Sequence, residues 1–424
     1  MNRAPGAGIP VAVEKRPALL HRLVDFLGLR RSMVALLSMV VLIGLGEKMA
    51  ERFLPVYLMA LGGGALSVGL LNGMDNLLSS LYSYPGGYLS DRLGYKRALI
   101  VFNLIALGGY LIVILFPSWQ AVIIGSILFI SWTAISLPAT MSMISLVLPK
   151  TKRTMGVSIH SLVRRIPMAL GPVIGGLFIQ SYGRVAGTRI AFGAAFVLGL
   201  VALFMQQALI REEEGAIGKQ AAEANPLRMF TLMSPSLRAL LVSDILVRFS
   251  EQIPYAFMAI YALDYVHVTP VQFGFLTAIE MVVAMLVYIP VAYLADRNTK
   301  KPFVVITFGF FTLFPLLLLF SHSFLMLIVA FIIRGLKEFG EPTRKALIMD
   351  LAPEDKKAGM FGVYYLIRDL IVSVAAFGSA FLWKIAPQAN FLTAFAFGAL
   401  GMVFFLLFGR DLGRIEERKT SLPA

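Results

Sequence analysis

The sequence contains no cysteine, 4 histidines among its 424 residues, and 15% charged residues. The absence of cysteine excludes disulfides, thiolate metal ligands and cysteine nucleophiles. The sequence also has no metal-ligand spacing and no nucleophile motif, which argues against an enzyme, and we expect neither a metal nor a cofactor. A G-x-x-x-x-G-K-[ST] phosphate loop is missing too, which argues against ATP-driven chemistry.

Apolar residues are abundant instead. They make up 58% of the chain, and the mean hydropathy is +0.79, whereas soluble domains average about 25% charged residues. A membrane-spanning helix needs about 20 apolar residues. Twelve such stretches are present, and they predict an all-α integral membrane protein with spans at about 32–60, 66–89, 98–116, 119–148, 155–181, 188–209, 238–265, 270–294, 302–320, 323–350, 357–384 and 389–409.

The net charge of +14 comes from short basic clusters between spans. Such clusters follow spans two, four, eight and ten, while the turns after spans one, three, seven and nine carry no Lys or Arg. By the positive-inside rule both termini are cytoplasmic, with Arg184 and Arg189 as mild exceptions. The bases form no stripe of the kind that binds nucleic acid. We expect a bacterial inner (plasma) membrane location.

The polar stretches divide the chain into five segments. Residues 1–31 resemble a basic amphipathic helix on the cytoplasmic membrane surface, because Leu19, Leu20 and Leu23 recur at helical spacing beside Arg16 and Arg22. The other segments are a six-helix bundle at 32–210, a cytoplasmic linker at 211–237, a second six-helix bundle at 238–409 and a cytoplasmic tail at 410–424.

The two bundles are versions of one another. Nine positions recur at an offset of 205, and eight of the nine pairs are identical while the ninth exchanges Asp75 for Glu280. Two homologous halves joined head to tail, in a chain this apolar, are typical of transporters. The pairs are Gly69/Gly274, Leu71/Leu276, Asp75/Glu280, Pro85/Pro290, Tyr88/Tyr293, Leu89/Leu294, Asp91/Asp296, Arg92/Arg297 and Lys96/Lys301.

The turn after span two reads Gly87-Tyr88-Leu89-Ser90-Asp91-Arg92-Leu93-Gly94-Tyr95-Lys96-Arg97. It resembles the G-x-L-[AS]-D-R-x-G-[RK]-[RK] signature of the major facilitator superfamily, from which Tyr95 departs. The second copy is degenerate, with Ala292 and Thr299 in place of glycines. The resemblance implies two pseudo-symmetric six-helix bundles around a cavity that opens to alternate sides. It also implies a conformational gate formed by Gly87, Asp91, Arg92, Gly94, Lys96, Arg97, Asp296 and Arg297.

Span five contains Gly171-Pro172-Val173-Ile174-Gly175-Gly176, which is similar to the G-P-x-x-G-G motif of the drug/proton antiporter branch. Pro167 stands where that branch has another glycine, and span four lacks that branch's arginine. Close helix packing is the alternative explanation for Gly171, Pro172, Gly175 and Gly176.

Asp75 and Glu280 stand alone on apolar stretches, with no base within four residues on the same helix. Burial disfavours the charged form of an isolated carboxyl group, so both are candidates for a coupling proton. Glu47 and Glu251 are further candidates. The alternative is a static tie from either acid to Arg164, Arg165 or Arg368 on another helix.

Other charges lie at mid-depth. Lys48 and Glu51 are spaced to pair, so the span-one charges either neutralise each other or line the cavity. In span ten, Gly340 and Pro342 predict a bend, and Arg344 and Lys345 are expected near the cytoplasmic surface, in solvent. The candidates for the substrate cavity are Arg164, Arg165, Arg334, Glu338, Arg368, Asp369, Tyr57 and Tyr255.

These features predict a secondary active transporter that moves a small organic solute by alternating access, through proton-coupled efflux. The alternatives are a uniporter or symporter of an organic anion, which would use Arg164, Arg165 and Arg368 as counter-charges, and a lipid-handling member of the superfamily. A transport-inactive sensor or scaffold is the alternative from another class. We expect a monomer in the lipid bilayer, with a small-molecule substrate and protons as its partners.

Overall fold

The computed structural model describes residues 31–130, 132, 136, 140, 160–209, 230–296, 299–353 and 357–411. The expected amphipathic segment at 1–31, most of the expected linker and most of the tail lie outside these residues. Within the described helices, the side chains of 31–33, 83–87, 90, 91, 95, 288, 289, 292, 293, 295, 296 and 357–359 are also outside the description.

The described helices overlap the predicted spans, although most of the second part of the span at 119–148 lies outside the described residues. The first half contains α2 (Arg31–Glu51), α3 (Leu54–Ala60), α4 (Gly64–Leu93), α5 (Tyr95–Leu115), α6 (Trp119–Phe129), α9 (Arg165–Tyr182) and α10 (Arg184–Leu209). The second half contains α12 (Pro235–Tyr255), α13 (Phe257–Ile260), the π-helix η2 (Tyr261–Tyr265), α14 (Pro270–Asp296), α15 (Lys301–Leu319), α16 (Phe324–Leu336), the 3₁₀ helix η3 (Lys337–Gly340), α17 (Glu341–Leu351), α18 (Lys357–Ile385) and α19 (Pro387–Phe408). The predicted all-α membrane fold is confirmed.

Local sequence fixes where several helices begin. The Ser118, Ser234 and Ser323 side chains each accept a hydrogen bond from the N–H three residues later, at the starts of α6, α12 and α16. Gly94, which separates α4 from α5, has φ +80° and ψ 154°, a conformation essentially restricted to glycine. The second glycine of the signature turn is therefore needed for its backbone.

Three predicted spans are interrupted rather than continuous. The 32–60 stretch breaks between α2 and α3, the 238–265 stretch between α12 and α13, and the 323–350 stretch at η3. Pro55, Pro254 and Pro342 lie next to these breaks, and proline lacks the N–H that an α-helix requires. Among the described residues, seven unbroken helices are long and apolar enough to cross a membrane.

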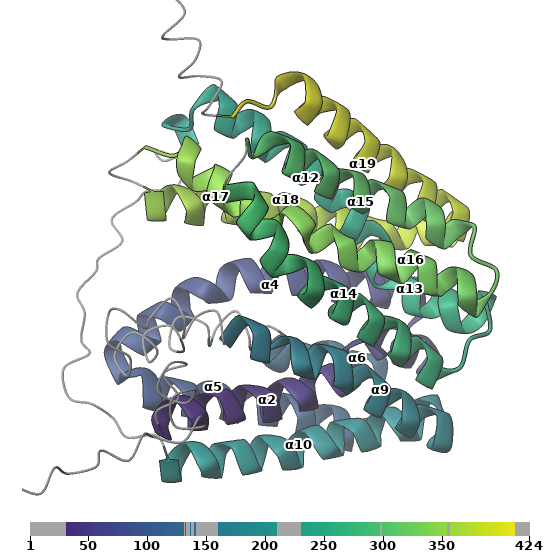
Figure 1. Cartoon of the computed structure of the whole chain (residues 1–424). Coiled ribbons are helices and arrows are strands. Elements are labelled where there is room, and N and C mark those ends of the chain that lie inside the picture. The colour runs from purple at the N-terminus through teal and green to yellow at the C-terminus, as the bar shows by residue number, and fades with distance from the viewer. Residues whose placement is uncertain are drawn as a thin grey trace, which may run out of the picture.

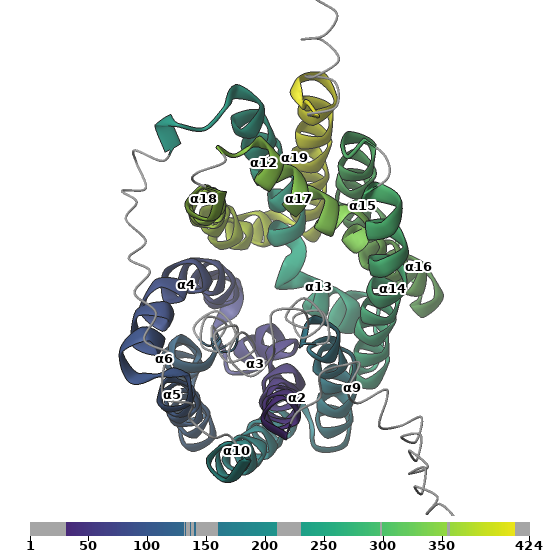
Figure 2. The same cartoon turned by 60° about the vertical axis from the view of Figure 1, so that its left-hand side comes forward.

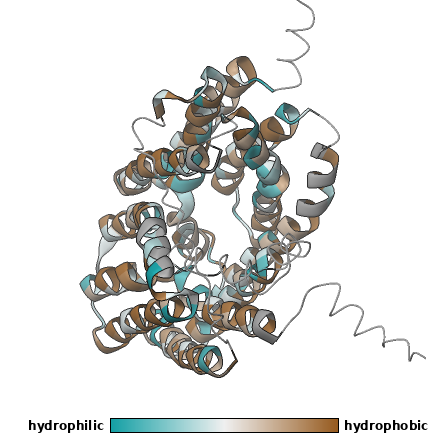
Figure 3. Cartoon of the chain, turned by 90° about the vertical axis from the view of Figure 1, so that its left-hand side faces the viewer, coloured by the Kyte–Doolittle hydropathy of each residue, from teal (hydrophilic) through white to brown (hydrophobic). Residues whose placement is uncertain are grey.

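The two halves form separate groups of helices (Figures 1 and 2). Helix α4 packs against α18, α9 packs against α14, and α3 packs against α13. The halves are closest where α14 and α18 face α9 and α4, and their helices diverge towards the end that carries the α4–α5 turn (Figure 1). Hydrophilic residues gather between the halves, while the outer faces are mostly hydrophobic (Figure 3).

Glycines allow the close approach. A Cβ on Gly175 would lie 1.9 Å from the Met49 carbonyl oxygen of α2. Across the interface, a Cβ on Gly176 would lie 2.5 Å from the Pro270 oxygen, and one on Gly274 would lie 2.5 Å from the Pro172 oxygen. The glycine motif of span five thus packs both within its own half and against α14.

Candidate substrate and coupling site

The first helix of each half breaks at the same depth. Arg52 lies in the break between α2 and α3, and Ala256 lies in the break between α12 and α13, at an offset of 204 residues (256 − 52). Helices interrupted at corresponding positions of two repeats mark the binding site in many transporters. A pocket lies between these breaks, and its wall includes Glu51, Arg52, Asp75 and Tyr255.

Asp75 is half-buried on α4 and lines this pocket. The Ser79 hydroxyl lies 3.5 Å from its Oδ1. Within the described part of the chain, no Lys, Arg or His forms an ion pair with it. The apolar side chain of Ile130 lines the same pocket.

Glu280, the repeat equivalent of Asp75, has a different environment. Its side chain is 1% exposed, and its Oε1 lies 2.8 Å from Nε of Arg334, which is also 1% exposed. Lys337 Nζ lies 3.6 Å from the same oxygen. Glu280 therefore takes part in an ion pair, with an arginine that was not among the partners considered from the sequence.

The repeat explains the difference between the two acids. Pro138 and Pro342 are equivalent at an offset of 204, and the same offset relates Ile130 to Arg334. The pocket beside Asp75 thus holds Ile130 where the second half holds the counter-charge of Glu280. Asp75 therefore has no ion pair among the described residues, and Ile130 stands where the second half has Arg334.

The Tyr255 ring links the halves between two guanidinium groups. The Arg52 guanidinium carbon lies 5.1 Å from the ring centroid, and that of Arg334 lies 5.5 Å from it. These distances are within the range of cation–π attraction. Arg52 forms no ion pair among the described residues, and its guanidinium group lies against this ring.

Asn72 joins the halves through the broken helix. At the break, the Ala256 N–H donates a hydrogen bond to the Pro254 carbonyl. The Gln252 carbonyl therefore lacks the N–H partner that a regular helix would supply. The Asn72 side chain of α4 donates to this carbonyl at 2.8 Å, and Asn76 donates to the Gln252 side chain at 3.2 Å.

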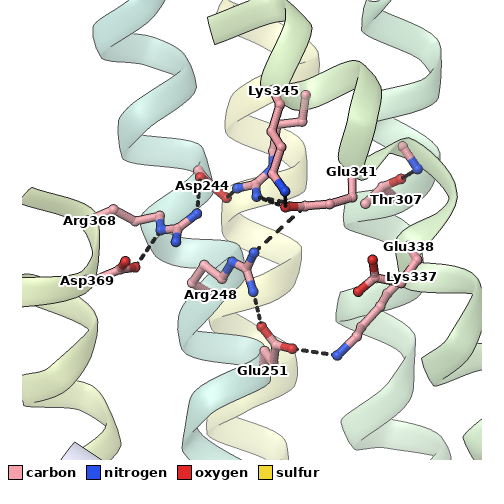
Figure 4. A network of polar contacts seen from close by, with 12 residues as sticks. Asp244, Arg248, Glu251, Thr307, Lys337, Glu338, Glu341, Lys345, Arg368 and Asp369 are labelled. Atoms are coloured by element: carbon pink, nitrogen blue, oxygen red, sulfur yellow. Dashed lines mark hydrogen bonds and ion pairs between the residues drawn. The ribbon is translucent and has the colours of Figure 1, made fainter. Parts of the chain in front are cut away.

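A larger ion-pair network fills the second half (Figure 4). Its centre is Asp244 of α12, which is 1% exposed and accepts hydrogen bonds from Arg344, from the Tyr364 hydroxyl at 3.1 Å and from Arg368 at 3.4 Å. Arg368 also donates to Asp369 at 2.7 Å. Every charge at this centre has a partner of opposite sign.

The network continues towards the middle of the molecule. Arg344 donates to both oxygens of Glu341, at 2.8 and 2.7 Å, and Glu341 lies 3.8 Å from Arg248. Arg248 pairs with Glu251, which also accepts a hydrogen bond from Lys337 at 2.6 Å (Figure 4). Glu251 is thus held by two cations.

Two sequence expectations change here. Arg344 was expected in solvent, but it is 1% exposed, because α17 turns it towards Asp244 and Glu341. Asp244 was not among the expected residues. Its spacing from Arg248 and Glu251, four and seven positions, places all three on one helix face and is the signal that could have identified it. Lys345 is exposed, as expected, and the α-helix expected to bend at Gly340 and Pro342 is interrupted there by the 3₁₀ helix η3.

The first half has a smaller cluster. Lys48 lies 3.2 Å from Glu47 and pairs with Glu51, as the spacing predicts. Glu47 and Lys48 line a second pocket together with His160 and Arg164. Within the described residues Arg164 has no ion pair, and it lines this pocket together with Glu47.

The remaining cavity candidates, Arg165, Glu338 and Tyr57, differ in their contacts. Arg165 donates to Glu338 at 3.0 Å and so connects α9 with η3 across the halves. Tyr57, by contrast, is fully buried, and its hydroxyl has no hydrogen-bond partner. No cluster of three or more potential metal ligands occurs among the described residues.

The gate is described only in part. The Arg92 guanidinium carbon lies 4.7 Å from the centroid of the Tyr88 ring, and Lys96 Nζ donates to the Gln207 carbonyl at 3.3 Å. The side chains of Asp91 and Asp296, and all of Arg297, lie outside the described residues. The gating role of Gly87, Asp91, Arg92, Gly94, Lys96, Arg97, Asp296 and Arg297 stays a prediction.

An all-helical membrane protein with two repeated halves around buried charges is the architecture of a transporter. The chain belongs to the Major Facilitator Superfamily, whose family model matches residues 36–243 and again 240–423. It is a member of a transporter family rather than an enzyme. An uncharacterised MFS-type transporter of Methanocaldococcus jannaschii is 24% identical over 360 residues, which cover 82% of this chain and 87% of the relative.

Solved structures share the fold at low sequence identity. A mutant of the nucleoside transporter NupG has a TM-score of 0.74 at 12% identity, covering 89% of this chain and 100% of that one. The peptide transporter POT in complex with sulfate has a TM-score of 0.73 at 15% identity, with coverage of 89% and 93%. A bacterial homologue of the lysosomal transporter Spinster, in an inward-facing and unoccupied conformation, has a TM-score of 0.71 at 15% identity, with coverage of 89% and 96%.

Proposed function

We propose that the chain exports a small organic solute in exchange for protons. The observation that carries the proposal is Asp75, a half-buried carboxylate without an ion pair among the described residues, in the pocket between the broken helices. Charging an unpaired carboxylate in a protein interior is costly, so such a group readily exchanges a proton when its surroundings change. Glu51, Arg52 and Tyr255 share its pocket and set its electrostatic surroundings.

Three other acids are candidates for the coupling proton, and each of them lies beside a cation. Glu280 is a second candidate for the proton, but Arg334 would have to move away before Glu280 could act. Glu47 and Glu251 are further candidates, although each already lies beside a lysine. Among the described residues no cation forms an ion pair with Asp75, which favours it as the coupling residue.

The arrangement of the helices supports alternating access. The halves diverge towards the end with the α4–α5 turn, which the basic residues predict to be cytoplasmic (Figure 1). We propose that this conformation faces the cytoplasm, and that opening of the opposite end breaks the Asn72–Gln252 contact. Asp91 would then act as a latch at the cytoplasmic end rather than as a substrate ligand.

The coupling proposal can be tested in proteoliposomes. We expect Asp75→Asn to abolish accumulation driven by a pH step while substrate counterflow, which needs no net proton movement, survives when it is measured at saturating substrate. Glu280→Gln is the matched variant at the repeat-equivalent position. If both variants still accumulate substrate in response to the pH step, neither acid carries the proton.

A second candidate function rests on Arg164. Of the three arginines considered as counter-charges for an anion, Arg165 is bonded to Glu338 and Arg368 to Asp244 and Asp369, whereas Arg164 has no ion pair in the described residues. An uncompensated arginine in a pocket favours an organic anion as substrate. This uniporter or symporter function becomes the better proposal if transport by the unmodified protein is independent of the pH gradient.

A further inference from the structure

Two charged side chains of opposite sign line one pocket without neutralising each other. Arg52 comes from the break between α2 and α3, and Asp75 comes from α4. Neither has an ion pair among the described residues, and the two form none with each other. The third charged group in the pocket wall, Glu51, is bonded to Lys48, which also lies 3.2 Å from Glu47.

The surroundings hold the two charges in place. The Arg52 guanidinium lies over the Tyr255 ring, 5.1 Å from its centroid, which leaves its hydrogen-bond donors available. Asp75 has the Ser79 hydroxyl at 3.5 Å from one oxygen, and a carboxylate has further acceptor sites. Apolar side chains, among them Leu71, Ile130 and Phe273, complete the wall.

We infer that this pocket binds a zwitterionic solute, with Arg52 binding its anionic group and Asp75 binding its cationic group. The inference rests on the proposed transport function and specifies its substrate class. A guanidinium matches a carboxylate with two parallel hydrogen bonds, and a carboxylate accepts from an ammonium group. The apolar wall between them suits the hydrocarbon part of an amino acid or short peptide.

The charge balance favours a zwitterion over a simple ion. A solute with only a cationic group would leave Arg52 uncompensated when the pocket closes around it, and one with only an anionic group would leave Asp75 uncompensated. A buried charge without a partner is strongly unfavourable, whereas a zwitterion neutralises both groups and adds no net charge. The same carboxylate would hold either the proton or the cationic group, so the two would exclude one another.

The test is binding to the purified full-length protein, measured by calorimetry and by the shift in Tm that a bound ligand causes. The probes are glycine, 4-aminobutyrate, 6-aminohexanoate and dialanine, which differ in the separation of their charges. Hexylamine and hexanoate are the matched probes with only one charge. We expect at least one zwitterion to bind and both single-charge probes to bind at least about tenfold more weakly, because each leaves one buried charge unpaired.

Variants locate the binding site. Arg52→Gln and Asp75→Asn should each weaken the zwitterion at least about tenfold, because each removes one partner of a charge pair. Arg52→Lys should retain more affinity than Arg52→Gln, which separates loss of charge from loss of folding. Lys384→Gln removes a positive charge from the exposed end of α18, outside the pocket, and should leave binding unchanged.

The outcomes distinguish this inference from the coupling proposal. Binding of hexylamine or hexanoate as tight as that of the zwitterions, no binding by any of the six probes, or zwitterion binding that survives in both neutral variants would overturn the zwitterion site. A zwitterion that binds through Arg52 and Asp75, but whose uptake ignores the pH gradient, would support the site and remove only the proton coupling.

Discussion

Asp75 and Glu280 occupy equivalent positions in the two halves and have opposite surroundings. Glu280 is 1% exposed and lies 2.8 Å from Arg334, while Asp75 is half-buried in a pocket and has no ion pair in the described residues. The difference comes from one exchange between the repeats, Ile130 for Arg334. Duplication thus produced two acids in equivalent positions, of which one is paired within its half and the other has no ion pair among the described residues.

The same asymmetry extends through both halves. The second half holds its charges in a continuous network from Asp244 to Lys337, whereas the first half holds a short cluster around Lys48 and leaves Arg52, Asp75 and Arg164 without ion pairs among the described residues. We infer that this network of ion pairs makes the second half the more rigid of the two. The first half carries the groups that are available for exchange.

The largest expected effect is on stability, from removing the counter-charge of Glu280. Arg334→Met leaves a buried carboxylate without its arginine, which typically costs about 3–5 kcal/mol. We expect the lower end of this range, because Lys337 remains 3.6 Å from Glu280. Thermal unfolding of the purified protein should show a clear fall in Tm, which the double variant Glu280→Gln/Arg334→Met should largely restore.

Asp75→Asn is the comparison for that experiment. Because Asp75 has no ion pair to lose, this variant should leave Tm unchanged or raise it. A loss of stability as large as that of Arg334→Met would mean that Asp75 is neutralised after all, and the comparison between the two acids would fail.

The second prediction transfers the ion pair to the first half. Ile130→Arg places a guanidinium in the pocket that contains Asp75. A neighbouring arginine favours the charged carboxylate by a factor of about 10–1,000, so accumulation driven by a pH step should fall at least tenfold. Proteoliposome uptake measures the effect. Ile130→Met, which changes the side chain without adding charge, should preserve most of the accumulation.

The third prediction concerns the contact beside Asp75 that holds the halves together. Asn72→Ala leaves the Gln252 carbonyl without its hydrogen bond, which costs about 1–3 kcal/mol in the conformation described here. The equilibrium should therefore shift towards the conformation in which the α4–α18 interface opens. The chain has no native cysteine, so Ser373→Cys, at a buried position of α18 opposite Gly73, serves as a single reporter.

Maleimide labelling of this reporter should become several-fold faster in the Asn72→Ala background. The control is Asn103→Ala, which also removes a buried asparagine hydrogen bond, at 2.8 Å to Gln206, but within the first half. Equal acceleration by both variants would indicate general loosening rather than a contact specific to the interface.

The sequence predicted a large part of this picture for clear physical reasons. Apolar length located the helices, and the repeat identified Asp75 and Glu280 as equivalent. The partners could not be predicted, because Glu280 pairs with an arginine 54 positions away (334 − 280) on a helix that is not its neighbour in sequence. No periodicity within one helix encodes that distance. Arg344 was misplaced for the same reason, since only the fold brings Asp244 to it.

The smallest expected effect tests the Arg165–Glu338 ion pair, which, like the Arg184–Asp264 pair, connects the two halves. Arg165 and Glu338 lie 3.0 Å apart, and their side chains are 16% and 22% exposed. A pair that solvent reaches contributes about 1 kcal/mol or less, so Glu338→Gln should slow transport only about two- to fivefold. The charge-swapped double variant Arg165→Glu/Glu338→Arg should recover part of the rate, because it restores an attraction at the same place. Thr140→Ala, in the uncharged equivalent region of the first half, should transport normally.

If Glu338→Gln instead abolishes transport, Glu338 contributes more than a tie between the halves, and its role as a cavity residue becomes the better explanation. If Glu338→Gln transports at the normal rate, the pair does not stabilise the conformation described here.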